Sequence, residues 1–157
     1  AAGGHTVIVE LLREIGVKNK NPLHVAAGIG NVKKVKELLN DGRDVNERDS
    51  FGATPLLIAT VAGQEEMVDL LLARKANPKI SAKDGYTLMH GAAFSGKKSM
   101  VKKALFLGLE VNPRYGDDGI TPTDVAEDEG DALPYLRALG GRTAWELGRE
   151  PQTPSQK

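Results

Sequence analysis

Apolar residues recur along this chain at the three- and four-residue spacing of amphipathic helices. This spacing predicts helices over 32–40, 65–74 and 98–107, each with aliphatic residues on one face. A shorter run rich in small residues precedes each of them, as in 23–27, and predicts a second helix in the same unit. A glycine separates the two helices of each unit, because glycine tolerates the positive φ at which a helix commonly ends. These glycines are Gly30, Gly63 and Gly96.

The whole pattern repeats with a period of about 33 residues. Each shorter helix follows a related tetrapeptide: Asn21-Pro22-Leu23-His24, Thr54-Pro55-Leu56-Leu57, Thr87-Leu88-Met89-His90 and Thr121-Pro122-Thr123-Asp124. Threonine followed by proline favours a helix start, because the hydroxyl caps free backbone amides and proline suits the first helical position. One such unit cannot bury its apolar face alone, whereas stacked units cover one another. The repeat therefore predicts a solenoid with a continuous core.

The order of these features resembles the ankyrin repeat: a turn, a Thr-Pro-Leu-His start, a small inner helix, a glycine, a longer outer helix and a Gly-Ala-Asp-Val-Asn-like tail. Residues 21–27 and 42–46 lie closest to that pattern, and the resemblance covers about 4–149. It implies an all-α solenoid, built from helix-turn-helix repeats that are joined by β-turn fingers.

Several positions depart from the ankyrin pattern. Leu57 and Asp124 replace the usual histidine, and Lys75 replaces the glycine after an outer helix. One residue is inserted at Tyr115-Gly116, so we expect local irregularity around 110–120.

We expect one domain over 1–149 followed by a flexible tail at 150–157. Its expected parts are an N-terminal cap at 1–20, repeats at 21–53, 54–86 and 87–120, and a C-terminal repeat and cap at 121–149. Within the caps, outer helices are predicted over 7–15 and 132–139, and 143–147 resembles a truncated inner helix.

Composition narrows the function classes. The 157 residues include 21 Lys and Arg against 21 Asp and Glu, and this zero net charge does not favour nucleic acid. The absence of cysteine excludes disulfides and thiol chemistry but leaves the compartment open. No run of about 18 apolar residues predicts a membrane span. The chain starts at Ala1, which indicates processing or trimming; a removed signal peptide would imply a secreted or periplasmic protein, whereas the family resemblance implies the cytoplasm.

Candidate catalytic and metal-binding residues are few. Gly28-Ile29-Gly30 lacks the third glycine of a dinucleotide-binding loop, since Lys33 stands there. His24 and His90 lie 66 residues apart at one repeat position, and the resemblance implies hydrogen bonds to the backbone of the neighbouring repeat rather than metal binding. The acidic residues of the last finger and the last inner helix are interpreted as a solvated face. We therefore expect no enzyme activity, no cofactor and no metal. The acidic residues are Asp117, Asp118, Asp124, Glu127, Asp128, Glu129 and Asp131.

Four lysines gather at the start of the third outer helix: Lys97, Lys98, Lys102 and Lys103. Lys98 and Lys102 are four residues apart and share one exposed stripe. A face that binds nucleic acid or an anionic surface is a minor alternative, because aromatic residues for base stacking are missing there. The main interpretation is a solubilising face.

The binding surface of a solenoid lies on its concave face and finger tips, where side chains are not needed for stacking. The candidate residues at the ends of the inner helices are Ile29, Val61 and Phe94, and those on the fingers are Arg48, Phe51, Lys83, Asp84, Tyr86, Tyr115, Asp117 and Asp118. An apolar stripe bordered by charge favours a protein partner, and aromatic residues are typical anchors of such interfaces. Packing of Phe51 and Tyr86 against the next finger remains an equal alternative.

We therefore expect a protein that is monomeric alone and that binds another protein as a scaffold or adaptor. The alternative is an inhibitor or self-protection protein that masks an enzyme partner.

Overall fold

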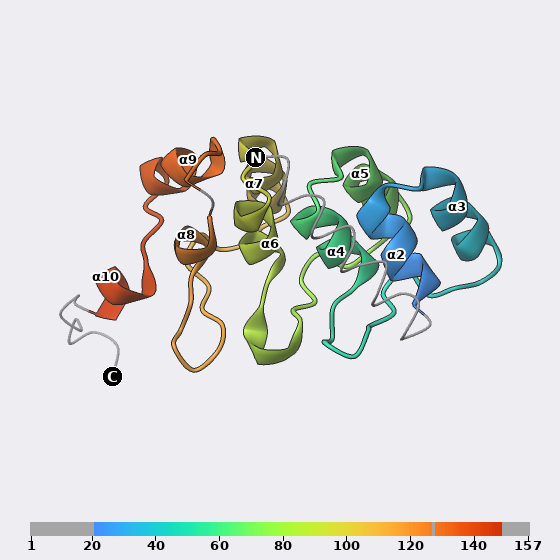
Figure 1. Ribbon diagram of the computed structural model, residues 1–157, viewed down its shortest axis with the longest axis horizontal. Coiled ribbons are helices and arrows are strands. Elements are labelled where there is room, and N and C mark those ends of the chain that lie inside the picture. The colour runs from blue at the N-terminus through green and yellow to red at the C-terminus, as the bar shows by residue number, and fades with distance from the viewer. Residues whose placement is uncertain (1–20, 127, 149–157) are drawn as a thin grey trace.

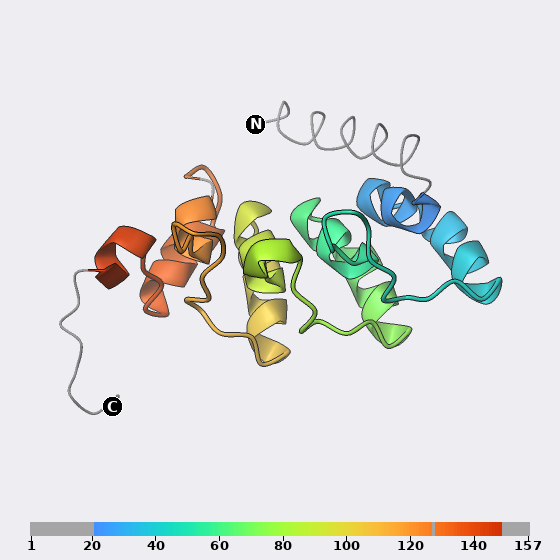
Figure 2. The same cartoon turned by 90° about the horizontal axis from the view of Figure 1, so that it is seen from below.

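The computed structural model describes residues 21–126 and 128–148. The predicted N-terminal cap at 1–20 and tail at 150–157 lie outside the described residues, as does Glu127. Within the described part, helices follow one another in pairs along a single axis (Figures 1 and 2). The inner helices are α2 (Pro22–Ile29), α4 (Pro55–Val61), α6 (Leu88–Phe94) and α8 (Pro122–Val125). Their outer partners are α3 (Val32–Asn40), α5 (Glu65–Ala73), α7 (Lys98–Phe106) and α9 (Ala132–Ala138), and α10 (Ala144–Gly148) follows.

The predicted all-α solenoid is confirmed. The first outer helix has the predicted bounds, and the next two end one residue earlier than predicted. Left-handed glycines separate the inner and outer helices of three pairs, with φ values of 77° at Gly30, 71° at Gly63 and 73° at Gly96. None of the described helices is both long and apolar enough to cross a membrane.

The last inner helix is shorter than predicted. Helix α8 has four residues, because Ala126 is extended with ψ at 132°. The prediction that Asp128 and Glu129 close an inner helix is therefore wrong, since both lie in the loop that follows. This loop returns to the preceding repeat, where the Ala132 N–H donates to the Gly96 carbonyl at 3.2 Å.

The core is one continuous layer of aliphatic side chains between neighbouring repeats. Leu23, Leu56 and Met89 occupy the same repeat position and are at most 1 % exposed. The inner helices approach closely because small residues face one another. A Cβ at Gly91 would lie 3.1 Å from Val61 Cγ2 and 3.2 Å from Leu57 Cδ1, which is tighter than ordinary packing.

Hydrogen bonds also join the inner helices α2 and α6 to the residue that precedes the start of the next repeat. The Nε2 atom of His24 lies 2.8 Å from the Ala53 carbonyl, and that of His90 lies 2.8 Å from the Ile120 carbonyl. Both histidines are buried, and the predicted structural role is confirmed.

A second set of hydrogen bonds runs along the opposite edge. Gln64 Nε2 donates to the Gly28 carbonyl at 3.3 Å, and Lys97 Nζ donates to the Gly63 carbonyl at 2.8 Å. The residues before α5 and α7 thus reach back to the end of the inner helix in the preceding repeat. These bonds add to those of the histidines, so hydrogen bonds join the repeats at both ends of the inner helices.

Candidate partner-binding surface

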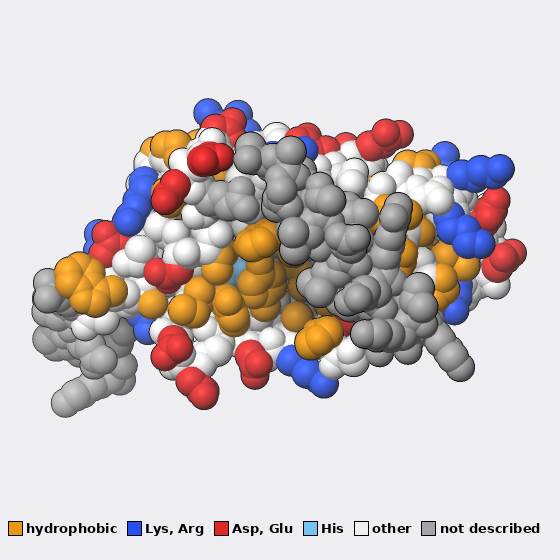
Figure 3. Space-filling model, in the orientation of Figure 1, with side chains coloured by type: hydrophobic (Ala, Val, Ile, Leu, Met, Phe, Trp, Pro, Cys, Tyr) orange, Lys and Arg blue, Asp and Glu red, His pale blue; other side chains and the backbone are white. Residues whose placement is uncertain are grey.

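The inner helices form one face of the array. Ile29, Val61 and Phe94 stand at the last turns of α2, α4 and α6 and are half-buried there. Figure 3 shows hydrophobic side chains gathered at the centre of this face, with charged side chains along the finger edge below. The structure therefore brings these three predicted residues onto one face, in successive repeats.

The first finger presents an exposed aromatic ring. The Phe51 side chain is 61 % exposed. Its backbone is fixed, because the Phe51 N–H donates to Asp49 Oδ1 at 2.9 Å and its carbonyl accepts from the Lys83 N–H at 3.0 Å. The next finger passes so close to Gly52 that a Cβ there would lie 3.1 Å from Lys83 N. The ring thus projects from a finger that is held on both sides.

Arg48 belongs to the same finger and is exposed, with its guanidinium lying across the gap to the second finger. Its Nε donates to the Gly52 carbonyl at 2.9 Å, and one terminal nitrogen donates to the Ser81 carbonyl at 2.7 Å. Arg48 therefore links two fingers through two of its N–H groups.

The second and third fingers carry the charged tips. Lys83 and Asp84 are exposed in the short 3-10 turn η1 (Lys83–Gly85), where Asp84 has a φ of 64°. The Asp84 carbonyl accepts from the Gly116 N–H at 2.8 Å, which ties the second finger to the third. In the third finger a β-bridge pairs Tyr115 with Ile120 and closes a hairpin around the inserted residue. Asp117 and Asp118 are exposed at the turn of that hairpin.

Tyr86 and Tyr115 lie deeper than the tips. The Tyr86 ring stacks on His90 at 5.1 Å between centroids, and the Tyr115 ring meets both of them edge-on at 4.9 Å. Burial raises the pKa of the Tyr86 hydroxyl well above its usual value, and the neighbouring Tyr115 adds to the rise. Burial likewise lowers the pKa of His90. This three-ring cluster packs the second finger against the third; its two tyrosines are half-buried and His90 is buried.

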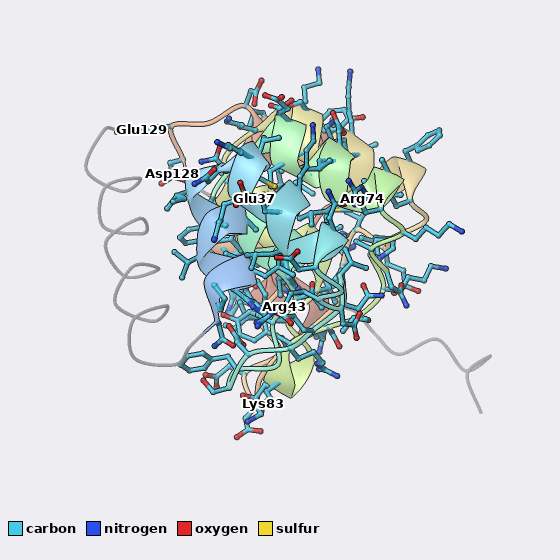
Figure 4. The ribbon with its side chains drawn as sticks, turned by 90° about the vertical axis from the view of Figure 1, so that its right-hand side faces the viewer. Glu37, Arg43, Arg74, Lys83, Asp128 and Glu129 are labelled. Atoms are coloured by element: carbon cyan, nitrogen blue, oxygen red, sulfur yellow. The ribbon has the colours of Figure 1, made fainter. Side chains whose placement is uncertain are left out.

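The sign of the charge changes along the finger edge. Lys83 lies beside the first finger, whereas Asp84, Asp117 and Asp118 follow toward the C-terminal end. Figure 4 looks along the array and shows Lys83 at the finger edge, with Asp128 and Glu129 at the opposite edge of the inner face. The face is thus bordered by acidic groups on two sides and by a basic group near Phe51.

The lysines of α7 have partners within the structure. Lys103 Nζ pairs with Asp69 Oδ1, and Lys97 Nζ donates to a backbone carbonyl. The ammonium groups of Lys98 and Lys102 lie 4.8 and 5.9 Å from the centre of the Tyr135 ring. These contacts favour the interpretation of a structural and solvated face. Over the described residues, no three His, Asp or Glu side chains converge to hold a metal ion.

The chain resembles proteins of a known family. The family model described as ankyrin repeats, in three copies, matches residues 1–84, which is more than half of the chain. The chain belongs to the ankyrin repeat family. Ankyrin repeats are typically non-enzymatic and generally serve as modules that bind other proteins.

Ankyrin repeat relatives are found in very different proteins. The chain is 31 % identical over 153 residues to a homologue of transient receptor potential cation channel subfamily A member 1 from Caenorhabditis elegans, covering 92 % of this chain and 12 % of that protein. It is 34 % identical over 113 residues to a putative ankyrin repeat protein of fowlpox virus, covering 69 % and 33 % of the two chains. It is 34 % identical over 110 residues to the rat ankyrin repeat and SAM domain-containing protein 6, covering 69 % and 12 %. The chain spans a third or less of the length of these three relatives.

Sequence reasoning missed two features of this ankyrin repeat array. Asp124 was assigned to the acidic solvated face, yet its Oδ2 accepts hydrogen bonds from the Thr121 N–H and hydroxyl at 2.8 Å each. Phe106, the most exposed large hydrophobic residue of the described part, was not considered at all. The signal was present, because Phe106 continues the four-residue stripe of Lys98 and Lys102.

Proposed function

We propose that this ankyrin repeat array binds a partner protein through its inner face and finger tips, as a scaffold or adaptor without catalytic activity. The observation that carries the proposal is the exposed Phe51 ring on a finger whose backbone is held by hydrogen bonds on both sides. Binding energy at protein interfaces concentrates in a few aromatic and arginine side chains. A ring that is already positioned loses little freedom when a partner covers it.

The charges beside Phe51 indicate the chemistry of the partner. Lys83 suits an acidic group on the partner next to the apolar site that receives Phe51. Asp117 and Asp118 suit basic groups about one repeat farther along. The apolar residues Ile29, Val61 and Phe94 supply contact area between these two ends.

The α7 lysines do not favour the nucleic-acid alternative. Lys97 and Lys103 already have polar partners within the fold, so phosphate contacts by these two would compete with existing interactions. The zero net charge of the chain also provides no general attraction for a polyanion.

Affinity capture from the native source tests the proposal with two matched phenylalanine variants. We expect Phe51→Ala to weaken binding of the captured partner by about 30-fold in a titration with purified proteins, the size of a typical interface anchor. Phe106→Ala, which removes an exposed ring from the outer helices, should leave this affinity unchanged. A partner that binds the Phe51→Ala protein as tightly as the wild type would refute the site.

The charged tips give a second measurement with the same partner. Exchanging Asp117 and Asp118 for lysine should slow association, and added salt should reduce the difference from the wild type. Turnover of a substrate by the purified chain would contradict the proposal that the protein is not an enzyme.

A further inference from the structure

A second exposed phenylalanine lies on the outer-helix side of the array. The Phe106 side chain is 92 % exposed at the end of α7. It borders a hollow of about 560 Å³ between α5 and α7. We call this region the outer hollow, and its lining residues are Asp69, Leu72, Lys102, Lys103, Phe106 and Leu107.

The position of Phe106 on its helix excludes a role in the core. Val101 and Ala104 form the buried side of α7 and are at most 1 % exposed. Phe106 follows Ala104 by two residues, which is about 200° around the helix, so its ring points outward. Leu72 and Leu107 are half-buried and form the apolar lining beside it. An apolar ring thus projects next to an apolar hollow of sufficient size to receive a ring of this kind.

The charges around the outer hollow have both signs. Lys103 Nζ pairs with Asp69 Oδ1 at 2.6 Å, yet 61 % of the Asp69 side chain remains exposed and can accept a second cation. Lys102 is exposed, and its ammonium lies 5.9 Å from the Tyr135 ring, a loose contact. One patch therefore carries a projecting ring, a hollow, a cation and an anion side by side.

A ring, a hollow and charges of both signs in one patch are the features that association with a second copy requires. In a two-fold dimer the same patch serves both partners, so each knob must face a hole and each charge its opposite. The zero net charge of the chain adds no long-range repulsion between copies.

We propose that the outer hollow is a self-association site for a second copy of this chain. Phe106 of each copy enters the outer hollow of the other, and Lys102 of each copy faces Asp69 of the other across the two-fold axis. This inference goes beyond the proposed function, because it uses the outer helices and leaves the finger tips free. A dimer of this kind presents two partner-binding faces and leaves the affinity of each face unchanged.

The size of the patch sets the strength of the dimer. Each phenylalanine buries roughly 150–250 Å², and the neighbouring aliphatic lining adds to that area. The two rings together bury roughly 300–500 Å², well below the roughly 1,200 Å² of a stable interface. The dimer is therefore weak and dissociates on dilution.

Sedimentation velocity of the full chain tests this, over concentrations on the order of 10 μM to 1 mM, the range in which weak complexes form. We expect the sedimentation coefficient of the wild type to rise toward that of a dimer. Phe106→Ala should weaken association at least about tenfold, whereas Phe51→Ala should associate like the wild type. Lys102→Glu should also weaken it, because two carboxylates then face each other across the axis.

Three outcomes would overturn the inference. The wild type could remain monomeric over the whole range, Phe106→Ala could associate as the wild type does, or Phe51→Ala could abolish association. Circular dichroism checks that each variant keeps the helical fold, which we expect because both rings are exposed. Partner binding by Phe106→Ala distinguishes this inference from the proposed function, since the latter requires that binding to persist.

Discussion

Replacing Asn21 with threonine should stabilise the first described repeat by completing a hydrogen-bond arrangement that the third repeat already has. In that third repeat, Nδ1 of His90 accepts from the Thr87 N–H at 3.1 Å and lies 2.8 Å from the Thr87 hydroxyl. In the first repeat, Asn21 makes no capping hydrogen bond with its side chain. The Nδ1 atom of His24, a residue 2 % exposed, has no hydrogen-bond partner among the described residues. Its nearest charged group is Glu47, with an oxygen 3.8 Å away.

The magnitude follows from the two groups that gain partners. A threonine cap contributes about 1 kcal/mol, and a buried acceptor without a partner costs about 1–3 kcal/mol. Part of this gain is offset, because the backbone of residue 21 must rotate from its ψ of 67° to the extended value that Thr54 has before Pro55, 161°. We expect a net gain of about 1–2 kcal/mol, equivalent to a rise of about 2–8 °C in the melting midpoint for a chain of this size.

Thermal and urea unfolding followed by circular dichroism measure this gain, and hydrogen exchange of the α2 amides shows whether it is local. Two further variants isolate the cause. Thr87→Asn should lose a similar amount in the third repeat. In a His24→Leu background, the gain from Asn21→Thr should fall to that of the cap alone. An unchanged or lower midpoint for Asn21→Thr, with Thr87→Asn destabilising as expected, would refute the reasoning.

Two further predictions concern the backbone conformation of Lys75 and the titration of Glu146. Lys75 has a φ of 66° at the repeat position where Gly42 and Gly108 have 95° and 84°. Lys75→Gly should therefore raise the free energy of unfolding by about 0.5–1 kcal/mol in urea titrations, and a loss of stability would show that the lysine side chain matters more than its strain. The N–H of Thr143 is the largest cause that lowers the pKa of Glu146, from 4.5 to about 2. Because the pKa of Glu146 is lower in the folded chain, its carboxylate should stabilise the docking of α10 fully above about pH 4.5, and this contribution should be lost as the pH falls toward 2. NMR titration of the Glu146 carboxyl measures the pKa, and a midpoint near 4.5 would contradict this prediction.

The repeat period predicted most of the fold because each unit repeats the same local signals. The bounds of α3 followed from its apolar spacing, and the glycine turns followed from glycine's tolerance of positive φ. The length of α8 could not be predicted from those signals. Gly130 lies in the loop after α8, where it approaches the preceding repeat so closely that a Cβ would overlap the Gly96 carbonyl. That contact draws the loop away from the helix axis, and it depends on the neighbouring repeat rather than on local sequence.

The candidate surface was predictable in position but not in accessibility. The period placed Phe51 and Tyr86 on fingers, yet it could not decide which ring points outward. The structure leaves Phe51 mostly exposed and stacks Tyr86 on His90. The difference arises from the third finger, whose inserted residue brings the Tyr115 ring against Tyr86. Arg48 was placed correctly on its finger, but its two carbonyl partners come from the backbone of two different fingers and are invisible to a periodic pattern.

At the fourth motif position, three different residue types take the same hydrogen-bonding role, whereas Leu57 has no polar side chain and Nδ1 of His24 has no partner among the described residues. His90, Asp124 and Glu146 each accept from the N–H of the threonine three residues earlier, at 3.1, 2.8 and 2.7 Å. A neutral histidine can also donate forward to the next repeat, whereas a carboxylate can only accept. The forward bond therefore reverses its direction at Asp124, whose Oδ2 accepts from the Ala144 N–H at 2.9 Å where His90 donates to a carbonyl. A carboxylate at this position thus preserves both the cap and the link between repeats, which explains why a departure from the family pattern leaves the stacking intact.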